Sequence, residues 1–503
     1  MPRPLSRSRF PLLVLLPISI FAPVFACSDA DVPATVQKPT PVLTDAATDT
    51  SVEVPDAEFD AGPDAAPYEG PAPYDGGPTV KPQVVDLGIV ASGVPISVQI
   101  PAKALGFHVM VESSVPSELL AITSVQAPNG EFFHDKATPA GGDHPTSETI
   151  LGSTAAVQVP QRAFSQDTVE QGTWKVVFAG PGTLRAKVQI QTTPDGVFHG
   201  GNLNLNVYLP AGLELGGKSG ITAKNAYANS EVRGRIDGFF AAIWQLYGLR
   251  NGTVRFFDIP SKFREIEDND LLTVFKESKV APHGQAINIV LSQVGNEGFW
   301  WGIAAGVPGA ANSPGNDQSG LALASVPEAS ADMEAWVLAH EAGHFMGLNH
   351  TTEFEGGVAD PLPDTPRCTT IENGDLESCP DFSNIMFPSG AVSPPIVTSP
   401  NQRRVVRGSP MIEAFAGGPA PSALLPPALG QWNPGVLDFG RLFGHAGQPL
   451  SRAERLVLAA SCGHASHRSL RIPAAQRSDV TRIANDPHAA KPMQGAARRL
   501  LAK

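Results

Sequence analysis

The sequence predicts an α/β domain built on a twisted, mostly parallel sheet and preceded by an all-β sandwich. Residues 81–195 contain short runs rich in β-branched residues, separated by Gly/Pro turns. From residue 200 onward, strand-like runs are interspersed with stretches that carry apolar residues at helical spacing. The chain has 503 residues, more than one hydrophobic core usually serves, so we expect several domains.

The composition limits the class of partner. The hydrophobic fraction of 42% is that of a globular protein, and the formal net charge is -13. A negatively charged chain is repelled by a phosphate backbone, so we expect no nucleic-acid partner. The composition carries no information on the oligomeric state.

The N-terminus has the pattern of an export signal, residues 1–26. Arginines precede an apolar run from Phe10 to Ala26, which is short and proline-interrupted for a membrane span. The run ends in V-F-A-C, which resembles a bacterial lipobox with Cys27 as the lipidated residue. Ordinary cleavage before Cys27 is the alternative. Both predict an exported protein, either lipid-anchored to the cell envelope or secreted.

Residues 27–80 predict a disordered tether, because they are acidic, rich in proline and poor in apolar residues. Such a tether suits a lipid anchor. Seven runs in residues 81–195 then predict the strands of a sandwich. They are VVDLGIV, VPISVQIP, GFHVMVES, LLAITSVQAP, AAVQVP, GTWKVVFAG and TLRAKVQIQTT. We expect a structural or propeptide role for this domain rather than a ligand site.

Residues 200–415 predict the α/β domain. Its expected strands are LNLNVYLP, GTVRFFDIP, AINIVLSQV and SGLALAS, and its expected helices are SEVRGRIDGFFAAIWQLYGL and SADMEAWVLAHEAGHFMG. Residues 416–503 end in an arginine-rich part and predict no particular fold.

Three histidines lie within the eleven residues HEAGHFMGLNH, and histidine is scarce in this chain. Ser330 can cap the helix that carries the first two. His340 and His344 then lie one turn apart on the same face. Gly347 allows the chain to leave the helix sharply, which brings His350 back toward the same ion.

Three imidazoles with an open fourth position are the coordination of a catalytic zinc site. Glu341 lies on the flank of the histidine face, where it can reach a zinc-bound water without being a ligand. These residues predict one Zn²⁺ held by His340, His344 and His350, with Glu341 as general base. A chance match to H-E-x-x-H-x-x-G-x-x-H is of order 10⁻⁴ or less at this composition, which disfavours three ordinary histidines.

This segment resembles the metzincins, zinc endopeptidases whose active-site helix carries the same extended motif. The resemblance implies a metzincin-type catalytic domain with a Met-turn beneath the histidines, and SNIMFPSG supplies Met386. The D-T-P segment at Asp364, the cysteine-bearing loop and Gln402 resemble the pappalysin-like branch. The resemblance is strong over residues 336–410. It implies no tyrosine ligand, because Pro388 stands at that position.

The resemblance also implies that a peptide substrate binds in extended form along an edge strand of the sheet. The family's edge strand precedes the active-site helix, and an ordinary buried strand is the alternative. The candidate residues are Gly320, Leu321, Ala322, Leu323 and Ala324.

Cys368 and Cys379 lie in one loop of an exported chain, which predicts a disulfide. Asp360, Asp364 and Asp375 offer oxygen ligands for Ca²⁺, and solvated acidic residues are the alternative. A second group, Cys462, His464 and His467, lacks a fourth ligand, so we do not expect a metal site there.

The sequence therefore predicts a zinc endopeptidase that acts on extracellular or periplasmic proteins. One alternative is a surface-anchored binding protein that uses the sandwich and carries an inactive protease-like domain. The presence of Glu341, whose role is chemical rather than structural, favours the enzyme. A zinc hydrolase of a non-peptide bond is a further alternative, because the shape of the pocket decides specificity.

Overall fold

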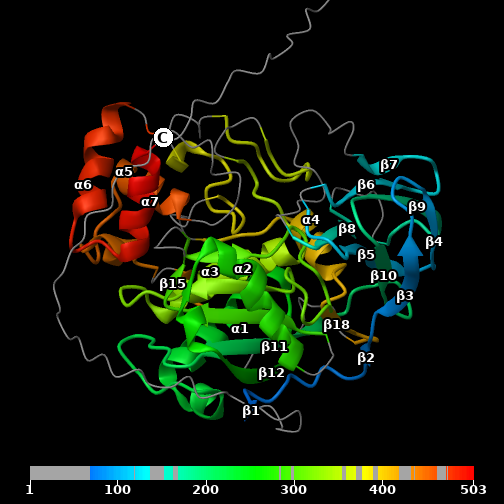
Figure 1. The fold of residues 1–503 in the computed structure, drawn as a ribbon, viewed down its shortest axis with the longest axis horizontal. Coiled ribbons are helices and arrows are strands. Elements are labelled where there is room, and N and C mark those ends of the chain that lie inside the picture. The colour runs from blue at the N-terminus through cyan, green and yellow to red at the C-terminus, as the bar shows by residue number, and fades with distance from the viewer. Residues whose placement is uncertain are drawn as a thin grey trace, which may run out of the picture. The chain divides into compact units, whose positions relative to one another are not determined.

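The computed structural model describes residues 68–117, 119–135, 152–161, 168–281, 285–295, 300–353, 358–369, 376–388, 395–418, 432–434, 437–461, 472 and 474–502. They all belong to one compact unit, Phe59–Lys503. This unit combines two antiparallel sheets with a mixed, partly parallel sheet and helices, a general α/β architecture (Figure 1). Among the described residues, none of the helices combines the length and apolar character needed to cross a membrane.

The first part is a sandwich of two four-stranded antiparallel sheets. One sheet has the order β3 (Gln83–Val90), β10 (Leu184–Thr192), β5 (Ala104–Ser113) and β8 (Thr154–Val159). The other has the order β4 (Ile96–Ile100), β9 (Gly172–Ala179), β6 (Ala121–Gln126) and β7 (Phe132–Asp135). Seven of these strands match the predicted runs, and β7, four residues long, was not predicted. Trp174 fills the core, edge-on to Phe107 at 5.1 Å.

The α/β part is built on a sheet whose central strands are parallel. Its order is β1 (Tyr68–Glu69), β12 (Arg250–Ile259), β11 (Gly201–Pro210), β14 (Ile287–Ser292), β17 (Gly320–Ala324) and β16 (Gly302–Ala304). The antiparallel strands β18 (Ile412–Phe415) and β2 (Thr79–Val80) extend one end of β11. A separate pair is formed by β13 (Glu265–Ile266) and β15 (Val294–Gly295).

Alternating residues of the central strands serve two cores, as the two-residue period of a strand requires. Leu321 and Leu323 join a hydrophobic cluster with α1 (Ser230–Tyr247) and α3 (Ala331–Phe345), whereas Ala322 and Ala324 join a cluster next to α2 (Asp268–Val274). The helices α1 and α3 pack directly on each other (Figure 1). A Cβ at Gly238 of α1 would lie 2.9 Å from the Ala335 Cβ of α3, so glycine allows this close approach.

The predicted tether is too long, because residues 68–69 and 79–80 form strands of the sheet. β1 pairs with β12, and β2 pairs with β18. The backbone between them is also bound, since Tyr74 N–H donates to Asn251 O at 2.9 Å. The Tyr74 ring packs under the Arg250 guanidinium at 4.4 Å. One aromatic anchor and an open sheet edge thus order a segment whose composition predicts disorder.

The prediction that Gly320–Ala324 is the edge strand is wrong. β17 is paired on both sides, in parallel with β14 and antiparallel with β16, and all five residues are buried. Within the described part of the sheet, β16 is the strand at this edge. The three residues of β16 were too short a run to be recognised in the sequence.

The C-terminal residues, for which the sequence predicted no fold, form α5 (Arg452–Ala460), α6 (Arg477–Asn485) and α7 (Lys491–Leu501). These helices contact one another (Figure 1). Their apolar residues share one hydrophobic cluster with α3. Phe439 packs edge-on against Trp301, which precedes β16, and against Trp336 of α3. This segment therefore supports the same region as the histidine motif.

The sandwich contacts the α/β part through buried polar side chains. His108 on β5 is 1% exposed, and its Nε2 lies 3.0 Å from Gly309 O. Burial is the main cause that lowers the pKa of His108 to about 4, because the charged imidazolium would lose its hydration. The hydrogen bond with Gly309 O opposes this shift in part, and the charge of nearby Lys187 adds to it. The folded protein therefore binds fewer protons here than the unfolded chain between this value and the usual 6.5.

His108 should make stability fall as the pH is lowered through this range, because the unfolded chain then gains a proton that the folded chain excludes. Between about pH 7 and about pH 4.5, we expect its contribution to the free energy of unfolding to drop by about 2–3 kcal/mol. Urea unfolding at both pH values should show a smaller drop in His108→Gln than in the wild type. The exposed His488→Gln should behave as the wild type, and an equal drop in all three would contradict this account.

Candidate metal centre

The helix α3 is buried on every side from Met333 to Phe345, which explains its alanine-rich sequence. It begins as predicted, with the Ser330 hydroxyl accepting a hydrogen bond from Met333 N–H. Polar side chains on such a helix need partners. Glu334 forms a buried ion pair with Arg235 of α1, which fixes the start of α3.

Near its other end, α3 turns as the glycine predicts. Gly347 has φ +99°, a left-handed conformation that favours glycine. Gly347 N–H donates to His344 O and Leu348 N–H donates to Gly343 O, both at 2.9 Å. This is a Schellman motif, which satisfies the last carbonyls of the helix. The chain then reverses and brings His350 against the helix.

The structure brings the three predicted histidines together. The Nε2 atom of His344 lies 3.0 Å from Nε2 of His340 and 3.1 Å from Nε2 of His350. Each side chain is about 1% exposed. Three nitrogens bound at about 2.0–2.1 Å to one tetrahedral ion stand roughly 3.3 Å apart, close to this spacing.

The opposite ring nitrogens have acceptors that fix the tautomers. His340 Nδ1 lies 2.6 Å from Ile385 O, and His344 Nδ1 lies 2.7 Å from Leu348 O. A carbonyl only accepts, so both Nδ1 atoms carry the proton and both Nε2 atoms present a lone pair.

The third ring has a charged acceptor, since His350 Nδ1 lies 2.9 Å from Glu353 Oε1. An ionised carboxylate holds the Nδ1 proton of an imidazole and makes the other nitrogen a better metal ligand. Three lone pairs that point at one another repel unless a cation lies between them. The donor set therefore fits a divalent metal ion bound by three imidazoles.

A second group of metal-compatible atoms in the described residues comprises Cys368, Cys379 and Asp381. The two sulfur atoms are bonded to each other, with a Cα–Cα distance of 5.0 Å, so they are not thiolate ligands. The predicted disulfide is confirmed.

No protein-family model matches the chain, and a search of curated proteins finds no similar sequence.

Glu341 follows His340 on α3 and is 1% exposed. Its carboxylate lies against the backbone of β16, because a Cβ at Gly302 would be 2.8 Å from Glu341 Oε1 and 2.4 Å from Val337 Cγ1. Only glycine fits at this position. The edge strand thus passes directly over the carboxylate of the residue that follows His340.

Met386 packs against α3. It is fully buried, and a Cβ at Gly343 would lie 2.6 Å from its Sδ atom. The turn is closed by Phe387 N–H donating to Asn384 O at 2.9 Å. The same turn supplies Ile385 O, the acceptor for His340. The shape of this turn therefore sets the orientation of the His340 ring.

A pair of amides holds this turn. Asn384 Nδ2 donates to Gln402 Oε1 at 2.9 Å, and Gln402 Nε2 donates back to Asn384 Oδ1 at 3.1 Å. Gln402 lies on α4 (Pro400–Arg407) and is fully buried. The Asp364 carboxylate accepts from Ser399 Oγ and Asn401 N–H, at 2.8 and 2.9 Å, and so caps the start of α4.

The calcium prediction stays a prediction. Both carboxylate oxygens of Asp364 accept hydrogen bonds at the start of α4. Asp375 lies outside the described residues. Burial and the nearby carboxylates of Asp364 and Asp381 raise the pKa of Asp360 well above its usual range. Cys27 and the group around Cys462 also lie outside the described residues.

Several supporting residues were not predicted, among them Glu353, Asn384 and Gly302. An acidic residue three positions after His350 was a weak signal, since nothing local shows that it folds back. Gly302 lies far from the motif in sequence, so only the tertiary fold reveals its contact with Glu341.

The purified chain should bind one divalent ion with high affinity, because the three lone pairs are preorganised. Zinc at 1,000 times its Kd should add about 4 kcal/mol to the free energy of unfolding. His344→Ala should abolish both the binding, measured by titration, and the shift in thermal unfolding. His199→Ala is the control, because His199 pairs with Asp195 and is not one of the three clustered histidines. Equal zinc binding by His344→Ala and the wild type would contradict the assignment.

Proposed function

We propose that this chain is a zinc-dependent endopeptidase of the metzincin type, similar to the pappalysin-like branch. The observation that carries the proposal is the convergence of three Nε2 lone pairs at the helix that also carries Glu341, directly after His340. The methionine beneath the helix and the amide-braced turn support the resemblance stated from the sequence.

A zinc ion held by His340, His344 and His350 would supply a coordinated water with a pKa lowered toward about 7 and a Lewis acid for a substrate carbonyl. Glu341 then acts as general base, taking the proton of the attacking water and passing it to the leaving amine. The Glu341 side chain is 1% exposed, so its neighbours exclude bulk water from the carboxylate. These surroundings suit a general base. His340, His344 and His350 keep their Nδ1 protons on fixed acceptors and stay neutral ligands.

The proposed substrate is a peptide in extended form, added as a strand along β16. In the described residues β16 has one strand neighbour, β17, and lies at the end of the sheet order. Its three residues are buried like those of β17, and Trp301 N–H just before it donates to Ser461 O at 2.9 Å, so the proposal rests on the open pairing side and not on exposure. Gly302 on this strand touches Glu341, so a peptide aligned here would pass close to the base. The substrates would be extracellular or periplasmic proteins.

The proposal includes export, through the signal peptide of residues 1–26 and lipidation of Cys27, which would place the enzyme at a membrane surface. The buried Cys368–Cys379 disulfide supports export, because such bonds persist in oxidising compartments. Palmitate labelling of the expressed full-length chain, compared with Cys27→Ala, tests the lipid anchor. Equal labelling of the two would count against it.

Glu341→Gln should retain zinc and lose peptide cleavage by about 10²–10⁴-fold, because the amide binds no proton at neutral pH. Cleavage of a diverse peptide library, with and without a zinc chelator, measures the activity. Asp332→Asn, an acidic residue in the first turn of the same helix, should leave cleavage nearly unchanged. Chelator-insensitive cleavage, or full activity of Glu341→Gln, would sink the proposal.

Gly302→Ala should lower kcat by at least about tenfold at unchanged zinc affinity, because the three atoms nearest to the added Cβ belong to Val337 and Glu341, so relief of the clash displaces Glu341. Gly417→Ala is the matched control, since a Cβ there meets no atom within 4 Å. A loss of zinc in Gly302→Ala, or an unchanged kcat, would show that β16 does not set the position of the base.

A further inference from the structure

Two buried glutamines of the sandwich reach the end of the active-site helix. Gln158 on β8 donates through Nε2 to Met346 O at 2.9 Å and to Val405 O at 2.8 Å. Gln161, just beyond the same strand, donates to Gly347 O at 3.0 Å. The two glutamines are 0% and 1% exposed.

The chemistry of these bonds is specific for a primary amide. Gln158 Nε2 donates both of its protons, one to the carbonyl of Met346, the C-cap of α3, and one to the carbonyl of Val405 on α4. Carbonyls at a helix C-terminus have no partner within the helix, so a buried end needs donors from elsewhere. Gln158 therefore gives Met346 O a donor, gives Val405 O a second donor beside Gly408 N–H, and ties together the ends of two helices.

The fit between the domains is close at the same place. A Cβ at Gly347 would lie 3.3 Å from Gln158 Nε2, and a Cβ at Gly106 of β5 would lie 2.4 Å from Gly408 O. Gly408 is the C-cap of α4. Backbone thus meets backbone without intervening side chains, which leaves little freedom to shift.

Both helix ends lead to the metal ligands. The turn held by Gln158 and Gln161 continues into Leu348, whose carbonyl orients His344, and then into His350. The helix α4 carries Gln402, which braces the turn that orients His340. A displacement at Gln158 would therefore reach all three imidazoles.

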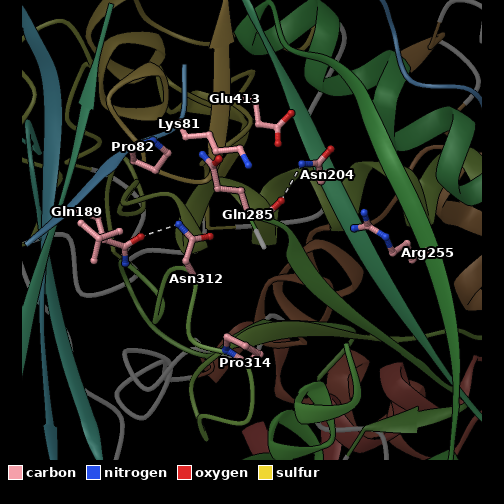
Figure 2. A pocket seen from close by; sticks show the side chains of 10 residues that line it. Lys81, Pro82, Gln189, Asn204, Arg255, Gln285, Asn312, Pro314 and Glu413 are labelled. Atoms are coloured by element: carbon pink, nitrogen blue, oxygen red, sulfur yellow. Dashed lines mark hydrogen bonds between the residues drawn. The ribbon is translucent and has the colours of Figure 1, made fainter. Parts of the chain in front are cut away.

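Other glutamines of the interface lie apart from the metal centre. Gln191 Nε2 donates to Ile412 O at 3.0 Å, and Gln189 bonds with Asn312 beside a cavity of about 380 Å³ (Figure 2). Figure 2 shows this cavity lined by Lys81, Arg255 and Glu413, none of them a ligand of the candidate centre. Gln191 is as buried as Gln158 and also donates to a backbone carbonyl. It is therefore a matched control.

We propose that Gln158, with Gln161, is a positioning residue through which the sandwich fixes the geometry of the metal ligands. The sandwich is then a permanent part of the working enzyme and not a removable propeptide. The inference rests on the proposed function only in calling the centre catalytic.

The test uses the full chain and zinc alone as the probe, with a competing chelator to measure affinity. Gln158→Leu removes the hydrogen bonds to Met346 O and Val405 O. Gln158→Glu replaces the amide donor with a carboxylate, which accepts and therefore repels the same two carbonyl oxygens. We expect the Kd for zinc to rise about tenfold or more in each, as for other residues that support metal ligands. Gln191→Leu should keep the wild-type Kd. Gln161→Leu, which removes the bond to Gly347 O and the acceptor of Gln158 N–H, should show a smaller rise and serves if the Gln158 variants do not fold.

The outcomes separate the two proposals. If the wild type binds no zinc, the proposed function fails. If the wild type binds zinc, and the Kd values of the Gln158 and Gln161 variants lie within twofold of that of Gln191→Leu, the positioning role is overturned. This holds even if thermal unfolding shows that the metal-free variants are less stable. Zinc affinity that falls equally in Gln191→Leu would likewise overturn it, since the effect would then be one of general stability.

Discussion

Three imidazole lone pairs that meet in a buried space are the constraint on which the rest of the structure depends. Each ring is aimed by a different acceptor: Ile385 O for His340, Leu348 O for His344 and the Glu353 carboxylate for His350. The acceptors lie on two loops: Leu348 and Glu353 in the stretch that follows α3, and Ile385 in the turn that contains Met386. The site exists only when these loops are held in register with α3 and with one another.

The surrounding structure supplies that register through close backbone contacts more than through large side chains. Gly343 admits the sulfur of Met386, Gly302 admits the carboxylate of Glu341, and Gly347 turns the chain under the sandwich. A methyl group at any of these positions would meet an atom or strain the backbone. Buried amides, Gln402 on one side and Gln158 on the other, then join these contacts to α4 and to the sandwich.

What the sequence could predict was local. The helix cap at Ser330, the face shared by His340 and His344 and the turn at Gly347 follow from spacing along one segment, and the structure has all three. Alternation predicted seven of the sandwich strands for the same reason. The disulfide followed from two cysteines in one loop.

What the sequence could not predict depends on pairings between distant segments. The order of β16 and β17 is decided by register across the sheet, so the edge was assigned to the wrong strand. Residues 68–80 are ordered by the partners they find on β12 and β18. Gln158 looked like one polar residue in an alternating strand, and its role depends on helix ends almost two hundred residues later.

The most direct measurement is X-ray absorption at the zinc edge of the fully loaded, full-length protein. The geometry predicts three imidazole nitrogens at about 2.0–2.1 Å and one further light atom, with no sulfur neighbour. Fewer than three imidazoles, or a sulfur ligand at about 2.3 Å, would contradict a shared ion at His340, His344 and His350.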